Sequence, residues 1–179
     1  REIAISLGQW HELASILNSL GELYAEQGEF NQALDIFLEA LSYRNKYIGP
    51  EYSRTLSHLG QLHTVKQERE QARDYYDDAY AWASQNYDTI GQINALSGLA
   101  EIDRIQGNLS TATEMLYEAL THFEALAPGL QDTNKVSLFE TQSYLYEQLQ
   151  QVLIAQGEIE TALVIAERGR ARAFSELLA

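Results

Sequence analysis

Apolar residues recur every three or four positions along most of the chain, in segments of about 15 to 20 residues that are separated by short turn signals. This spacing places the apolar side chains on one face of an α-helix. Only two prolines, Pro50 and Pro128, occur in the whole chain, so few positions forbid a helix. The sequence therefore predicts an all-α fold.

The turn signals divide the chain into antiparallel helix pairs. Gly28, Gly107 and Gly157 lie where a helix is expected to end on a left-handed residue. Gln67 takes this place in the second pair, so a different or looser turn is expected there. The predicted helices are 1–7, then 10–27 with 30–48, 51–67 with 69–87, 89–106 with 109–126, and 135–156 with 159–178.

The helix pairs are related by an internal repeat. The segment 17–41 aligns with 56–80, 96–120 and 146–170, at successive shifts of 39, 40 and 50 residues. Small residues recur in each pair, where they let two helices approach closely. They are Gly21, Gly60 and Ala100 in the first helices, and Ala33, Ala72, Ala112 and Ala162 in the second helices. Large side chains that are expected to fill the space between neighbouring pairs recur at Phe37, Tyr76 and Leu116.

This pattern resembles the tetratricopeptide repeat. The Leu, Gly, Tyr, Ala, Phe and Ala positions of that family match Leu17, Gly21, Tyr24, Ala33, Phe37 and Ala40. The spacing exceeds the 34 residues of the basic repeat and is similar to the long repeats of kinesin light chains. The resemblance implies a right-handed superhelical solenoid of antiparallel helix hairpins. It implies one array over residues 1–179, with 1–8 ending a preceding repeat and hairpins at 10–48, 51–87, 89–126 and 135–178.

A tetratricopeptide array implies a protein or peptide partner held on the concave face, which the first helix of each pair lines. The positions that the family uses for this purpose are Asn18, Glu22, Arg54, Ser57, Gln61, Asn94, Ser97, Glu101 and Arg104. Asn18 and Glu22 stand where a chaperone-binding array needs Lys and Asn, so a chaperone adaptor is not expected. Arg54 and Arg104 either engage an acidic peptide segment or pair locally, and both interpretations stay open.

Near the C-terminus, the stretch AERGRARA carries Arg168, Arg170 and Arg172 in an otherwise acidic chain. It resembles the end of the array that precedes the caspase-like domain in the bacterial CHAT family. This likeness implies a cytoplasmic bacterial protein in which the three arginines contact a following effector domain. Two alternatives stay open: a terminal capping helix, and a peptide-sensing regulator of the bacterial quorum type.

Charge and composition exclude several other classes of function. The chain has 26 Asp and Glu against 12 Lys and Arg, a formal net charge of -14, which argues against a nucleic-acid partner. No uninterrupted apolar run approaches the roughly 20 residues that span a bilayer, so no membrane role is expected. The absence of cysteine excludes disulfides and thiolate chemistry.

The sequence predicts neither catalytic residues nor a site for a cofactor or metal. The four histidines, His11, His58, His63 and His122, form no HExxH motif, and His58 and His63 are five residues apart, off a common helical face. The glycines follow the repeat and never cluster into a phosphate-binding loop. We therefore expect a binding module rather than an enzyme.

Overall fold

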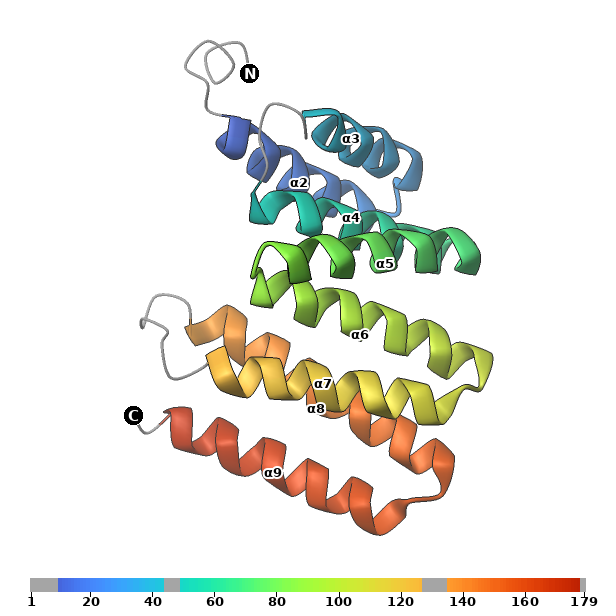
Figure 1. Cartoon of the computed structure of the whole chain (residues 1–179), viewed down its shortest axis with the longest axis vertical. Helices are drawn as coiled ribbons and strands as arrows, with labels where there is room; N and C mark the ends of the chain where they lie inside the picture. The colour runs from blue at the N-terminus through green and yellow to red at the C-terminus, as the bar shows by residue number, and fades with distance from the viewer. Residues whose placement is uncertain (1–9, 44–48, 127–134, 178–179) are drawn as a thin grey trace. The chain divides into compact units, whose positions relative to one another are not determined.

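The structure, a computed structural model, describes the backbone of residues 10–43, 49–126 and 135–177, and the side chains of 10–43, 49–126 and 143–171. Within these ranges the secondary structure is helical and contains no strand, which confirms the all-α prediction (Figure 1). The helices are α2 (Trp10–Glu26), α3 (Phe30–Ser42), α4 (Pro50–Val65), α5 (Arg69–Gln85), α6 (Thr89–Gln106), α7 (Leu109–Leu126), α8 (Lys135–Gln156) and α9 (Ile159–Leu177).

The helix boundaries agree with the predicted ones to within two residues, except at the end of α3. That helix ends at Ser42, six residues before the predicted end at position 48, and residues 44–48 lie outside the described part of the chain. The predicted helix at 1–7 also lies outside it. The next hairpin begins directly at Pro50, because proline is favoured in the first turn of a helix.

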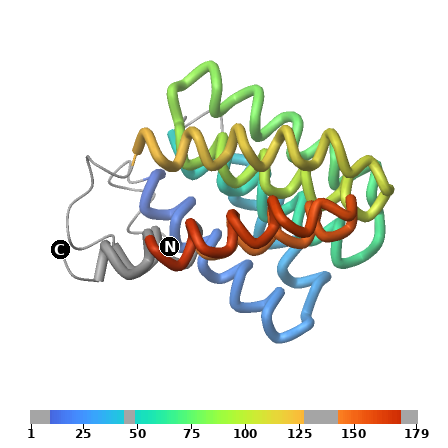
Figure 2. Tube along the Cα trace, turned by 90° about the horizontal axis from the view of Figure 1, so that it is seen from below, coloured from blue at the N-terminus to red at the C-terminus, as the bar shows by residue number. Residues whose placement is uncertain are grey.

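The chain divides into two compact units, residues 1–98 and 99–179, whose boundary falls within α6. In the first unit α2 pairs with α3 and α4 pairs with α5, and α4 also packs on both helices of the preceding pair. In the second unit α8 contacts both α7 and α9, and Figure 2 shows α8 and α9 running side by side. A single array over residues 1–179 stays a prediction.

A buried aromatic ring lies between the first helices of neighbouring pairs. The ring of Phe37 packs against Gly21, where an added Cβ would lie 2.7 Å from Phe37 Cδ1, and stacks on His58 with ring centroids 5.1 Å apart. Tyr76 repeats this arrangement one pair later, between Gly60 and Gly98. The glycines therefore stand where a first helix passes close to a large side chain, as the repeat predicts.

The small residues of the second helices are equally constrained. Ala33, Ala72, Ala112 and Ala162 are all buried. The large residues that were expected to fill the space between pairs, Phe37, Tyr76 and Leu116, are buried too. These positions confirm the predicted register of the repeats, since a shift by one residue would turn them towards solvent.

The expectation of a different turn at Gln67 is wrong. Gln67 adopts φ 63°, in the same left-handed region as Gly28 at 78° and Gly107 at 83°. The hydrogen bonds also match: Gln67 N–H donates to Thr64 O at 2.9 Å, as Gly28 N–H donates to Ala25 O at 3.0 Å. The turn is fixed by backbone hydrogen bonds that any residue can make, so the glutamine accepts the strain instead of changing the turn.

We expect Gln67→Gly to raise the free energy of unfolding by about 0.5–1 kcal/mol, because glycine adopts a positive φ without strain. The reciprocal change Gly28→Gln should lower it by a similar amount. Urea denaturation of both variants tests this pair. Changes of the same sign in the two variants would contradict the expectation.

Candidate partner-binding groove

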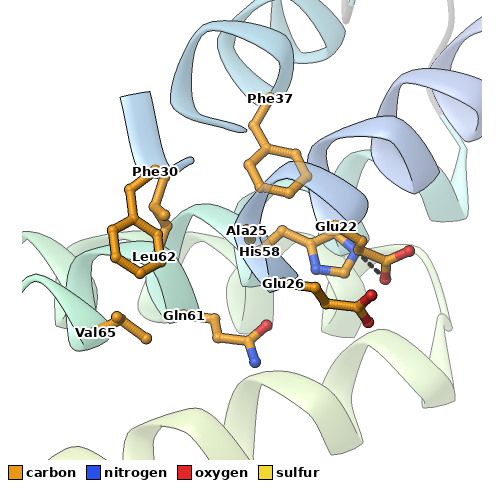
Figure 3. A pocket seen from close by; sticks show the side chains of 9 residues that line it. All are labelled: Glu22, Ala25, Glu26, Phe30, Phe37, His58, Gln61, Leu62 and Val65. Carbon is orange, nitrogen blue, oxygen red and sulfur yellow. Dashed lines mark ion pairs between the residues drawn. The ribbon is translucent and has the colours of Figure 1, made fainter. Parts of the chain in front are cut away.

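The first unit contains a pocket of about 310 Å³ between the C-terminal halves of α2 and α4 and the start of α3 (Figure 3). Residues four apart on a helix project from the same face, so each helix presents a pair of side chains to this space. Its lining comprises Glu22, Ala25, Glu26, Phe30, Phe37, His58, Gln61, Leu62 and Val65.

The two ends of the pocket differ in polarity. Figure 3 shows Phe30, Leu62 and Val65 together at one end, and the carboxylates of Glu22 and Glu26 at the other. Val65 is 54% exposed, which is high for an aliphatic side chain that lines a hollow. The pocket therefore offers accessible apolar surface next to negative charge.

Glu22 is held by two neighbours from α4. Its carboxylate lies 3.1 Å from His58 Nε2 and 3.2 Å from Arg54 Nη2. The hydrogen bond from His58, helped by the attraction of His58 and Arg54 and opposed by burial, lowers the pKa of Glu22 to about 2. Glu22 is therefore ionised at physiological pH, and Arg54, which also lies 3.6 Å from Glu51 Oε2, is engaged by carboxylates of its own chain.

Glu26 differs from Glu22 in having no such partner. It lies one turn further along α2 and is exposed at the rim of the pocket. Within the described residues, the structure shows no hydrogen bond or ion pair to its carboxylate. Glu26 thus contributes a negative charge at the pocket rim that this part of the chain does not neutralise.

Asn18, which was expected on the partner-binding face, is not accessible to a partner. The residue is 0% exposed, its Nδ2 donates to Glu51 Oε2 at 2.9 Å, and its Oδ1 accepts from Thr55 Oγ1 at 2.9 Å. A buried amide must satisfy its polar atoms within the protein. Asn18 does so with two residues of α4, and these bonds join α2 to α4. We therefore remove Asn18 from the partner-facing set and assign it to the packing of the two hairpins.

The other predicted positions of the first unit lie on the first helices but differ in accessibility. Ser57 and Ser97 are buried, Asn94 is half-buried, and Gln61 is exposed. Of all the partner-facing positions predicted in this unit, only Glu22 and Gln61 line the pocket. Burial of the serines follows from the close approach of neighbouring hairpins, which repeat position alone does not reveal.

In the second unit Arg104 and Glu101 form a bidentate ion pair along α6. The Arg104 Nε and Nη2 atoms donate to the two carboxylate oxygens of Glu101 at 2.6 and 2.7 Å. Burial, together with the charge of Glu101, raises the pKa of the Tyr144 hydroxyl, which accepts a hydrogen bond from Gln148. Of the two interpretations of Arg54 and Arg104, local pairing is the arrangement that the structure shows for both.

The arginines of α9 are also paired where their side chains are described. Arg168 Nη2 lies 2.6 Å from Glu124 Oε1 on α7. Arg170 pairs with Glu167 one turn earlier on its own helix. The side chain of Arg172 lies outside the described residues. A contact of the three with a following domain stays a prediction.

Five residues of the pocket could not be assigned to a site from the sequence: Ala25, Glu26, Phe30, Leu62 and Val65. His58 was considered only as a metal ligand. A signal for one of the five is present in the repeat. Val65 and Ile105 are aligned positions in the last turn of their first helices, and both are exposed. The recurrence of an exposed aliphatic residue at this repeat position is the signal that the sequence contains for the apolar end of the pocket.

The described residues offer no arrangement that suits a metal or a membrane. They contain no group of three or more His, Asp or Glu side chains that could hold a metal ion. None of the described helices combines the length and apolar character needed to cross a bilayer.

The lowered pKa of Glu22 predicts a pH dependence of stability. Because the pKa falls from 4.5 to about 2 on folding, the stabilisation by the Glu22 carboxylate is complete above pH 4.5 and is lost as the pH falls towards 2. We therefore expect Glu22→Gln to lower the melting temperature at pH 7, and the difference from wild type to shrink between pH 4.5 and 2. Gln61→Ala, which removes no titrating group, should follow the wild-type profile. A Glu22→Gln difference that is constant over this range would contradict the expectation.

Comparison with known proteins agrees with this architecture. Residues 12–81 and 51–125 match the model of the tetratricopeptide repeat family. Tetratricopeptide repeat protein 28 of Mus musculus and that of Homo sapiens are each 45% identical to this chain over 74 residues, which are 40% of this chain and 3% of the relative.

A solved structure shares the fold. The crystal structure of BtubC (BKLC) from P. vanneervenii is similar with a TM-score of 0.71 and 20% identity, over 93% of this chain and 65% of that one. Repeats of this kind generally mediate protein–protein interactions, and their fold is typically a non-catalytic scaffold. With more than half of its residues matched by the family model, this chain belongs to the tetratricopeptide repeat family.

Proposed function

We propose that this chain is a non-enzymatic scaffold that holds an extended segment of a partner protein against its first helices. The observation that supports this most strongly is the pocket between α2 and α4. Its apolar residues Phe30 and Val65 remain accessible, while Arg54 and His58 fix the carboxylate of Glu22 inside the pocket. A binding site of this kind combines apolar contact area with a few preorganised polar groups.

The proposed contact residues revise the set predicted from the repeat. In the first unit they are Glu22, Glu26, Phe30, Gln61 and Val65, with Asn94 further along the chain. In the second unit they are Glu101 and Arg104, whose mutual ion pair holds both side chains in place. Arg54 acts on the partner indirectly, by positioning Glu22.

Site-specific photo-crosslinking tests this function. A benzophenone amino acid at position 61 replaces the exposed Gln61 at the pocket, and one at position 78 replaces the exposed Asp78 on α5. In a lysate of the source cells we expect position 61 to capture a discrete partner, and an excess of unlabelled chain to prevent the capture. Equal capture from both positions, or capture from position 78 alone, would contradict the proposal.

A second element of the proposal is that the array regulates a caspase-like effector domain through α9. Leu163 and Val164 on this helix are 57% and 65% exposed, which leaves apolar surface beside the arginines. If a longer protein carries that domain, exchanging Arg168, Arg170 and Arg172 together for alanine should speed proteolysis of the interdomain contact with little change in the melting temperature of this chain. Unchanged proteolysis would favour the capping helix.

For the alternative, a peptide-sensing regulator of the bacterial quorum type, a low-molecular-mass lysate fraction should compete with the crosslink at position 61.

A further inference from the structure

We propose that the pocket of the first unit selects a basic and apolar segment, in which one apolar side chain enters the pocket and a neighbouring Lys or Arg pairs with Glu26. This inference rests on the proposed function and specifies the chemistry of the partner. It differs from the acidic segment that was one of the two interpretations of Arg54 and Arg104.

The charges around the pocket favour a cationic ligand. Two carboxylates, Glu22 and Glu26, line the pocket. Arg54 and His58 of the same chain already lie against Glu22. Because Arg54 already lies against Glu22 and Glu51, an incoming carboxylate would have to compete with carboxylates of its own chain for the guanidinium. Glu26, which has no ion pair among the described residues, is the charge that a ligand can neutralise without breaking an existing contact.

The shape of the pocket specifies the apolar part of the ligand. Its volume of about 310 Å³ accommodates one large aliphatic or aromatic side chain, and Phe30, Leu62 and Val65 provide the contact surface at one end. Since Figure 3 shows Glu26 at the other end of the same hollow, the apolar group and the cation should come from neighbouring residues of the ligand. Such a pairing of an apolar anchor with a complementary rim charge is common in selective interfaces.

An acidic segment fits the same surface poorly. Its carboxylates would meet the unneutralised Glu26 at the rim and the ionised Glu22 inside it. Like charges brought together at a partly desolvated surface oppose binding. The carboxylates of Glu22 and Glu26 thus oppose the binding of acidic segments and favour that of basic ones.

Selection from a random peptide library tests the proposal. The probe is a phage-displayed library of random dodecapeptides, and the target is the immobilised full chain. We expect enriched sequences to carry a large apolar residue with Lys or Arg within two positions. Enrichment of acidic sequences, or of apolar ones without a nearby cation, would overturn the proposal.

Three variants connect the selected peptide to the pocket. Glu26→Arg should weaken binding of the most enriched peptide by about tenfold or more, and Val65→Lys should do the same by placing a charge on the apolar end. Glu114→Arg makes the same charge change at an exposed position of α7 and should leave the affinity within about twofold. Fluorescence anisotropy with the synthetic peptide measures the affinities, and circular dichroism confirms that each variant is folded. Equal weakening by Glu26→Arg and Glu114→Arg would reject the pocket as the site.

The selection also separates this inference from the proposed function. If peptides are enriched and bind at the pocket but are acidic, the scaffold function stands and the basic specificity fails. If no peptide is enriched and the crosslinker at position 61 captures no protein, both fail together.

Discussion

Phe37→Ala is expected to lower the free energy of unfolding by about 3–5 kcal/mol, because the ring is buried and a smaller side chain leaves a cavity. Phe37 packs between Gly21 of its own hairpin and His58 of the next one. Its removal therefore weakens the packing within a hairpin and the packing between hairpins at once. Urea denaturation followed by circular dichroism measures the loss.

The control for this variant is the next residue on the same helix. Leu38 is 42% exposed, against 1% for Phe37, so Leu38→Ala should lower the free energy of unfolding by less than about 1 kcal/mol. Both substitutions replace a large apolar residue with alanine in α3 and differ in helix propensity by only a few tenths of a kcal/mol. Equal losses would show that the repeat register is wrong.

Gly21→Ala is expected to lower the free energy of unfolding by about 1–3 kcal/mol, against the usual trend for this exchange within a helix. Elsewhere in a helix, alanine is more favourable than glycine by about 1 kcal/mol. At Gly21 the new methyl group would overlap the ring of Phe37, with Cδ1 and Cζ both 2.7 Å away. Any shift of the buried Phe37 ring away from Gly21 would disturb its stacking on His58, so the clash is costly to relieve.

A double-mutant cycle identifies the clash. Phe37→Leu removes the Cε and Cζ atoms of the ring, so Gly21→Ala should cost much less in that background than in the wild type. Ser19→Ala, an exposed change in the same helix, should have the same small effect in both backgrounds. An equal cost of Gly21→Ala with and without Phe37→Leu would mean that the two residues do not determine the approach of the helices.

The fold could be predicted from the sequence because its constraints repeat. Each hairpin needs a small residue at the same place, and Ala33, Ala72 and Ala112 supply it at nearly constant spacing. The strain at Gln67 could not be predicted in this way. Its residue type suggested another turn, but the hydrogen bonds of the helix end favour one backbone geometry strongly enough to impose it.

The site was less accessible to prediction than the fold. Repeat position assigned Glu22 and Gln61 to the first helices, and both line the pocket. It did not reveal that Arg54 pairs with Glu22, a residue 32 positions away, or that Asn18 is buried by its bonds to α4. These facts depend on which side chains meet across neighbouring hairpins, and a pattern along one helix does not contain them.

Chemical-shift mapping of the complex tests most directly whether the first helices hold the partner. Two-dimensional amide spectra of the isotopically labelled chain would be recorded with and without the most enriched peptide. We predict that the largest shifts fall at the ends of α2 and α4 and at the start of α3, in residues 22–30 and 58–65, with smaller changes along α5. Largest shifts on α5 or α9, with the residues of the pocket unchanged, would contradict a partner site between the first helices.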